Sequence, residues 1–193
     1  MKIKSLLLQL LAGCTLVIAM LSPAAAQTRV TLGIELGARF QLPQCAAGEV
    51  ESAARLCYKS AMTTRKATGA DEYVVLIPDA GRPPYVRTEI KVMVLKGVVE
   101  AMQIGTWGLQ AQDIALEDLT KKYGKPTQMK QEVQKNLRVR IPTFFADWEL
   151  KEFSVKLTGA LGSLDWGRID IITHQYRSLS GSAEKQTPAK PAK

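Results

Sequence analysis

The first 26 residues constrain the fold most, because they read as an export signal and not as part of a folded domain. Two lysines precede a largely apolar run at residues 6–21, and an A-x-A site ends at Ala26. This order is typical of a secretory signal peptide and predicts cleavage after Ala26. We therefore expect the rest of the chain to fold in the oxidising bacterial periplasm.

The same segment allows two other fates. Leu11-Ala12-Gly13-Cys14 matches a lipobox, in which Cys14 would be lipidated and become the mature N-terminus. The apolar stretch before Cys14 is short and the residues after it stay apolar, which favours cleavage after Ala26. An apolar run of about 16 residues is also slightly short for a retained membrane span. Membrane attachment is therefore expected only if Cys14 is lipidated.

The remainder of the 193-residue chain has the length of one domain, which we place at residues 27–178. From residue 179 onward Ser, Gly, Pro, Ala and Lys dominate, so residues 179–193 are expected to form a disordered basic tail. Signal and tail together carry about half of the net charge of +8. The surplus left on the domain favours an anionic cell-wall component as a partner. Nucleic acid is not expected, because the chain lacks a basic-aromatic motif.

Cys45 and Cys57 are the two cysteines that follow the signal. An even pair in an oxidising compartment predicts a disulfide, with two buried free thiols as the alternative. One straight helix from Cys45 to Cys57 would hold the two Cα atoms about 18 Å apart, whereas a disulfide tolerates about 7 Å. The segment 46–56 must therefore turn back on itself as a stapled loop.

Several runs rich in β-branched residues predict strands. Tyr73–Ile77 ends at a proline, and Thr88–Leu95 and Val98–Thr106 flank Lys96-Gly97, which indicates a hairpin. In the first hairpin strand apolar and polar residues alternate, which indicates one buried and one partly wet face.

A helix is predicted over residues 111–123, with acidic residues early, lysines late and Gly124 as its end. Thr143–Leu150, Phe153–Leu157 and Arg168–Thr173 follow as an antiparallel meander, with a flexible connection at 159–167. The polar stretch 129–140 stays ambiguous. The sequence thus predicts an α+β fold, with an antiparallel sheet, one main helix and a disulfide-stapled N-terminal loop.

Candidate catalytic groups do not converge in the sequence. His174 is the single histidine and has no partner motif, so a strand-end histidine with one hydrogen bond is the favoured interpretation. The pairs Asp165/Asp170 and Glu149/Glu152 could serve as acid and base in a glycosidase-type site. Scattered acids are common on strand surfaces, so we expect no catalytic, cofactor or metal site.

Two features suggest binding instead. Trp107, Trp148 and Trp166 could form an aromatic platform, although tryptophans beside strands more often fill the core. The segment Arg82-Pro83-Pro84-Tyr85 is a candidate partner-binding loop, because its prolines hold it rigid. A simple connection between strands is the alternative for this loop.

Several segments occur here in a characteristic order. They are Leu42-Pro43-Gln44-Cys45, Lys96-Gly97-Val98-Val99, the helix ending Lys122-Tyr123-Gly124-Lys125-Pro126, Trp148, and the strand Asp165–Thr173. With these segments the stretch from about Thr88 to Thr173 resembles small exported proteobacterial proteins of uncharacterised function. The resemblance implies export and a layout of hairpin, helix and meander, and it brings no catalytic residues.

The sequence therefore favours a non-enzymatic periplasmic domain that binds another protein or an anionic component of the cell envelope. A small carboxylate-dependent envelope hydrolase is the first alternative. An inhibitor or immunity-type protein that acts through the loop Asp79–Tyr85 is the second.

Overall fold

The structure is a computed structural model that describes residues 29–46, 48, 53–65, 67–136 and 139–186. The predicted signal peptide with Cys14, the cleavage point after Ala26 and the last seven residues of the predicted tail lie outside this range. No helix among the described residues is long and apolar enough to cross a membrane.

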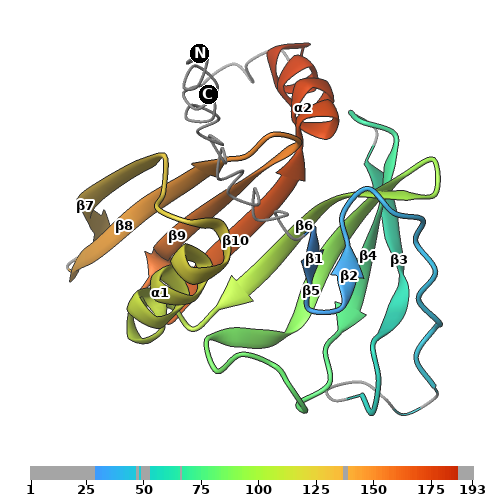
Figure 1. Ribbon diagram of the computed structural model, residues 1–193, viewed down its shortest axis with the longest axis horizontal. Coiled ribbons are helices and arrows are strands. Elements are labelled where there is room, and N and C mark those ends of the chain that lie inside the picture. Colours follow the sequence, from blue (N-terminus) through green and yellow to red (C-terminus); the bar gives the residue numbers. More distant parts are fainter. Residues whose placement is uncertain (1–28, 47, 49–52, 66, 137–138, 187–193) are drawn as a thin grey trace, which may run out of the picture.

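One eight-stranded antiparallel sheet dominates the fold, and a two-stranded hairpin and two α-helices accompany it (Figure 1). The elements in chain order are β1 (Val30–Thr31), β2 (Ile34–Glu35), β3 (Cys57–Arg65), β4 (Ala70–Leu76), β5 (Val86–Leu95), β6 (Val98–Thr106), the 3-10 turn η1 (Gly108–Gln110), α1 (Gln112–Tyr123), β7 (Gln128–Asn136), β8 (Val139–Glu149), β9 (Phe153–Ser163), β10 (Trp166–Thr173) and α2 (His174–Gln186). The predicted α+β fold with an antiparallel sheet is confirmed.

Two four-stranded meanders build the sheet and meet in its middle (Figure 1). Strands β3 to β6 follow one another, and β7 to β10 do the same after α1, which gives the order β3-β4-β5-β6-β10-β9-β8-β7. β6 pairs antiparallel with β10 from Thr106 opposite Gly167 to Ala101 opposite Ile172. The last strand of each meander is therefore central, and β3 and β7 are the two edges.

The predicted hairpin at Lys96-Gly97 is confirmed as β5 and β6. Leu95 lies opposite Val98, so the turn contains two residues. Lys96 and Gly97 both have positive φ, at 52° and 80°, as a type I′ turn requires. The ladder shifts register between Met93 and Val94, and beyond this irregularity Val92 lies opposite Met102, where both are buried.

Helix α1 matches the prediction for residues 111–123 to within one residue. Asp113 lies in its first turn and Lys121 and Lys122 in its last, which suits the helix dipole. Gly124 closes the helix with φ of 83°, and its N–H donates to the Thr120 carbonyl oxygen at 2.9 Å. The helix then passes directly into the second meander.

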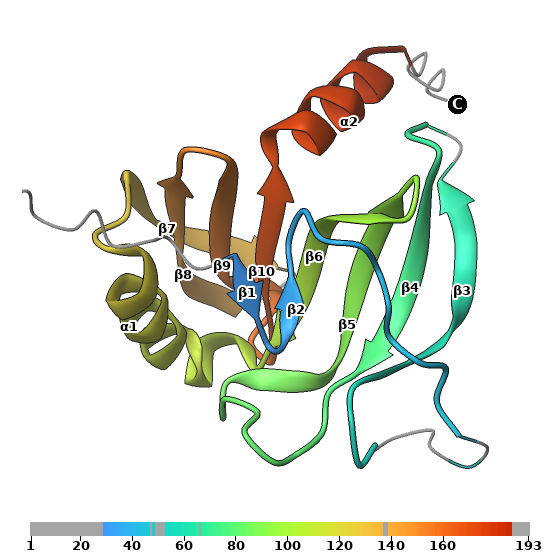
Figure 2. The same cartoon turned by 45° about the vertical axis from the view of Figure 1, so that its right-hand side comes forward.

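The two faces of the sheet are covered differently (Figures 1 and 2). α1 and the β1–β2 hairpin lie over one face, and their buried side chains join those of the strands in the main core. On the opposite face α2 covers one end, where Tyr176 packs against Ala70, Met93 and Ala101. Much of this second face stays polar and open.

The predicted disulfide between Cys45 and Cys57 is present, with a Cα–Cα distance of 4.9 Å. Cys57 begins β3, and with Ala53 and Leu76 it forms a small core of its own beneath the stapled loop. The backbone of residues 43–45 then runs beside Tyr58, where Cys45 N–H donates to the Tyr58 carbonyl and Tyr58 N–H to the Pro43 carbonyl.

Three segments differ from the sequence-based expectation. Residues 174–186 form a second helix, α2, so residues 179–186, which were expected in the disordered tail, are helical. Thr173 caps this helix by accepting a hydrogen bond from the Tyr176 N–H at 3.1 Å. Of the stretch 129–140, which the sequence left ambiguous, residues 129–136 belong to strand β7 and residues 139–140 begin β8. The connection expected to be flexible at 159–167 is mostly strand, because β9 continues to Ser163.

Replacing both Cys45 and Cys57 by serine should lower the free energy of unfolding by roughly 3 kcal/mol, because the disulfide limits the entropy of the unfolded chain. For a chain of this size that loss corresponds to a fall in Tm of roughly 6–12 °C. Thermal unfolding followed by circular dichroism measures it. The wild-type protein with reductant should unfold at the temperature of the double variant, and an unchanged Tm in that variant would contradict the prediction.

Candidate functional site

Two tryptophan rings and one arginine meet where β5, β6 and β10 lie side by side. The guanidinium carbon of Arg87 lies 4.1 Å from the ring centroid of Trp107 and 4.3 Å from that of Trp166. Arg87 Nη2 donates to the Asp165 carbonyl oxygen at 2.8 Å, and Nε donates to the Thr106 carbonyl oxygen at 3.3 Å. The arginine is therefore held by β6 and by the turn that precedes β10 while it stacks on two rings.

Glycines allow this close stacking. A Cβ atom on Gly105 would lie 3.2 Å from Arg87 Cδ and 3.4 Å from Trp166 Cη2, so both side chains rest directly on the β6 backbone. Gly108 has φ of +60°, and a Cβ there would lie 2.1 Å from the Leu164 carbonyl oxygen. Because Gly108 has no Cβ, the backbone of η1 packs directly against the β9–β10 turn. The Leu109 N–H donates to the Leu164 carbonyl oxygen at 2.7 Å.

The rings remain accessible despite their fixed positions. Trp107 and Trp166 are each 42% exposed, and Leu164, whose carbonyl oxygen accepts the Leu109 N–H two residues after Trp107, is 39% exposed. We call Arg87, Trp107, Leu164 and Trp166 the aromatic cluster. The cluster presents exposed apolar side chains on a rigid β6 backbone. Exposed apolar patches of this kind occur at interaction sites.

The structure brings together two of the three tryptophans considered for a platform. Trp148 is 1% exposed and lies in the core, where its Nε1 donates to the Gly124 carbonyl oxygen at 2.8 Å. Trp107 and Trp166 instead lie where strands end, each directly before a glycine. The Trp-Gly pattern is a sequence signal that could have identified these two rings. No sequence signal identifies Arg87 and Leu164, because their positions in the cluster depend on strand register.

A second feature is a cavity of about 110 Å³ between α1, the β1–β2 hairpin and the sheet. Its lining is mostly apolar, with a few polar groups at its edge: Thr31, Leu32, Pro83, Tyr85, Val86, Ile104, Asp118, Leu119, Lys122, Ile169 and Ile171. Small-molecule sites usually need roughly 300–1,000 Å³. This cavity has room for one side chain or a few waters.

The candidate partner-binding loop Arg82–Tyr85 forms a wall of this cavity. Tyr85 is buried and its hydroxyl donates to Asp118. Arg82 is held by the Val86 carbonyl oxygen, at 2.8 Å, and by Asp79. Pro84 alone among the four residues is exposed. The two largest side chains of the loop, Arg82 and Tyr85, therefore make their contacts within the protein.

The carboxylates considered for catalysis do not form pairs. Asp165 lies in the β9–β10 turn, whereas Asp170 lies five residues further along β10, which corresponds to roughly 15 Å in an extended chain. Asp170 is buried and accepts hydrogen bonds from Gln103 at 3.1 Å and Arg168 at 2.8 Å. Glycosidase carboxylates lie about 5–10 Å apart. This arrangement does not suit that chemistry.

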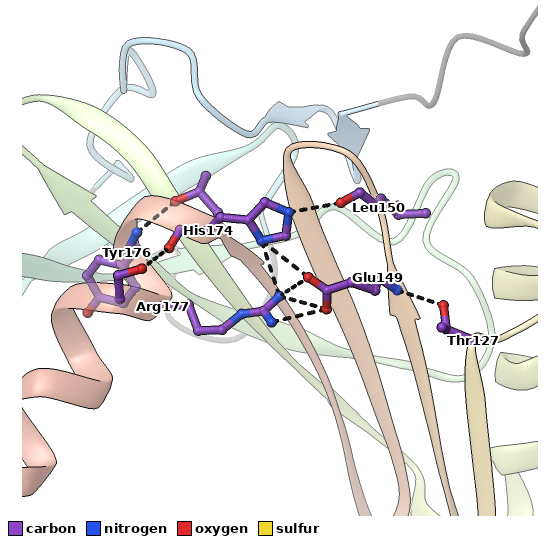
Figure 3. A network of polar contacts seen from close by, with 8 residues as sticks. Thr127, Glu149, Leu150, His174, Tyr176 and Arg177 are labelled. Atoms are coloured by element: carbon purple, nitrogen blue, oxygen red, sulfur yellow. Dashed lines mark hydrogen bonds and ion pairs between the residues drawn. The ribbon is translucent and has the colours of Figure 1, made fainter.

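Glu149 and His174 belong to a polar network at the start of α2 (Figure 3). Arg177 donates to both carboxylate oxygens of Glu149 at 3.0 Å. His174 Nε2 lies 2.9 Å from the Leu150 carbonyl oxygen, and Nδ1 lies 3.3 Å from Arg177 Nη2. Because a carbonyl oxygen only accepts, Nε2 carries a hydrogen, and Nδ1 also lies 3.4 Å from Glu149 Oε1.

The same network has a structural role. Glu152 pairs with Arg29 and not with Glu149, and its carbonyl oxygen accepts the His174 N–H at 3.2 Å. The histidine thus fastens the first turn of α2 to the β8–β9 turn through its ring and its backbone. Both ring nitrogens are engaged in these contacts. No cluster of three metal-ligating side chains occurs among the residues that the structure describes.

Replacing Tyr85 by phenylalanine should lower the free energy of unfolding at pH 7 by roughly 1–2 kcal/mol, because it removes the hydrogen bond to Asp118. Burial, reinforced by Asp118, raises the pKa of Tyr85 well above its usual range. The unfolded tyrosine ionises near pH 10 while the folded one does not, so the stability that Tyr85 confers is complete below pH 10 and fades above it.

Urea unfolding at pH 7 and near pH 11 checks this sign. The difference between wild type and Tyr85→Phe should shrink at the higher pH. A difference of equal size at both values would contradict the raised pKa. Leu179→Met, a change on an exposed side chain of α2, is the control that should leave stability unchanged at either pH.

Comparisons with protein-family models, with curated proteins and with solved structures find no match for this chain.

Proposed function

We propose that this protein is a non-enzymatic binding domain of the bacterial cell envelope, which holds a partner protein through its aromatic cluster. The export-like N-terminal sequence supports the compartment. The disulfide between Cys45 and Cys57 is consistent with it, because such bonds persist in oxidising compartments.

The exposure of two tryptophan rings on a rigid base is the observation that carries this proposal. Exposed indole rings bury a large apolar area when a partner covers them, and tryptophan is enriched among the residues that dominate binding energy. Arg87 and the glycines beneath it hold Trp107 and Trp166 in place before binding. Little conformational entropy is then lost when a partner docks.

A protein partner is favoured over an anionic cell-wall component by the way Arg87 is used. Its donors go to the carbonyl oxygens of Thr106 and Asp165, and its faces lie against the two rings. Nearby Arg168 pairs with Asp170. Both arginines of this region are therefore engaged within the protein, and the exposed Asp165 next to Trp166 is itself an anion, which disfavours an anionic partner.

The alternatives have less support. A carboxylate-dependent hydrolase needs two acids close together, whereas Asp165 and Asp170 are far apart and Glu149 and Glu152 each pair with a different arginine. An inhibitor that acts through the loop Asp79–Tyr85 would bind with outward side chains, whereas the two largest of this loop, Arg82 and Tyr85, make their hydrogen bonds within the protein.

A photo-crosslinking amino acid at position 164, in cells that export the protein, tests the proposal. Crosslinking should capture a defined envelope protein, which mass spectrometry identifies. The affinity of the purified partner should then fall by at least about 30-fold in Trp107→Ala and in Trp166→Ala, since central aromatic anchors typically contribute 2 kcal/mol or more.

Ile114 on α1 provides the matched control, because it is an apolar side chain with 50% exposure outside the cluster. Ile114→Ala should bind the partner like wild type, and a crosslinker at position 114 should not capture it. A captured partner whose affinity is the same for Trp107→Ala and wild type would refute the role of the cluster. Binding that disappears with moderate salt would point to the anionic component instead.

A further inference from the structure

The two edges of the sheet are protected to very different degrees. β3 pairs with β4 through two register shifts, between Tyr58 and Ala61 and between Ala61 and Thr63, and residues 43–45 run along its outer side at Tyr58. Bulges and covering segments are the usual means by which proteins stop an edge strand from pairing further. This edge is therefore closed.

The opposite edge is open. β7 pairs with β8 over nine residues without a register shift, and it contains neither proline nor glycine. Outside the sheet ladder, no described backbone hydrogen bond reaches residues 128–136. Along an antiparallel strand every second residue points its N–H and C=O away from the paired neighbour, so β7 presents a row of unpaired groups to a further strand.

The outer surface of β7 also carries apolar side chains that the fold does not cover. Met129 is 48% exposed and Val133 is 52% exposed. Met129 lies opposite Ala146 and Gln131 opposite Phe144, so these side chains are on the face of the main core. Lys130 and Glu132 lie on the other face and form an ion pair with each other.

We propose that β7 is a homodimer interface, in which it pairs antiparallel with β7 of a second copy of this chain about a two-fold axis at Gln131. In this register residue numbers of opposing residues add up to 262. Lys130 then lies opposite Glu132 of the other copy, and Met129 lies opposite Val133. Each contact occurs twice, as an isologous interface requires.

The charge and apolar patterns select this partner. Opposite charges directly across an antiparallel pair stabilise it, whereas like charges destabilise it. A shift of the axis by one residue, to Glu132, would place the Glu132 carboxylates of the two copies against each other. The axis at Gln131 instead places Lys130 opposite Glu132 and Met129 opposite Val133, and the sheet becomes continuous across the dimer.

Charge reversal tests the register without disturbing the fold, because the side chains of Lys130 and Glu132 are 72% and 37% exposed. Lys130→Glu and Glu132→Lys each place like charges opposite one another, so each should weaken the dimer by about tenfold or more. The double variant K130E/E132K restores opposite charges and should dimerise like wild type. An equimolar mixture of the two single variants should form heterodimers.

Sedimentation equilibrium over a range of concentrations measures all four outcomes, with circular dichroism to show that each variant is folded. A wild-type protein that stays monomeric would overturn the proposal. So would single variants that dimerise as strongly as wild type. A dimer that resists these charge changes but is lost in Trp107→Ala would assign self-association to the aromatic cluster and overturn the β7 interface.

A crosslink defines the axis independently. In a Cys14→Ser background, Gln131→Cys should form a disulfide-linked dimer under mild oxidation, because residues opposite one another have Cα atoms about 4.5–5.5 Å apart. Lys130→Cys is the matched control. Its Cα atoms in the two copies would be roughly 8 Å apart, beyond the reach of a disulfide. Equal crosslinking at both positions, or none at 131, would refute the register.

Discussion

The pairing of β6 with β10 is the contact on which the rest of the structure depends. It joins two meanders that are otherwise separate in the chain, and it requires close approach of the backbone at Gly167. A Cβ atom on Gly167 would lie 2.4 Å from both the Thr106 Oγ1 and the Gly159 carbonyl oxygen. Only glycine allows the two strands to meet here in this register.

The candidate site is a direct result of that seam. Arg87 comes from the first meander and Trp166 from the second, and the register that aligns Gly105 with Arg168 brings them together. Neither meander alone contains the aromatic cluster. The aromatic cluster therefore forms only when the two meanders are paired, because each meander contributes part of it.

The sequence predicted the elements that local chemistry determines. The β5–β6 turn follows from Gly97 after a β-rich run, and the end of α1 follows from Gly124. The disulfide followed from compartment and cysteine count. Each of these depends on residues near one another in the chain or on a general rule of chemistry.

Other elements were missed because tertiary contacts hold them. β7 is a polar edge strand, so its sequence lacks the apolar run that indicates a buried strand. α2 is rich in serine and depends on Tyr176 packing against the second face and on the fastening of His174 to the β8–β9 turn. β9 continues past Gly159 because Thr143 Oγ1 donates to the Ala160 carbonyl oxygen at 3.1 Å and accepts its N–H at 2.7 Å.

The two proposed surfaces are compatible because they lie apart in the sheet. The cluster lies on the central strands, and β7 is three strands away from β10. In a β7–β7 dimer the two copies of β10 are separated by seven inter-strand spacings, or roughly 34 Å. A twist of about 20° per strand over that span turns the two clusters away from each other. Such a dimer would therefore bind two partner molecules, one at each cluster, and would not bind one partner molecule with both clusters.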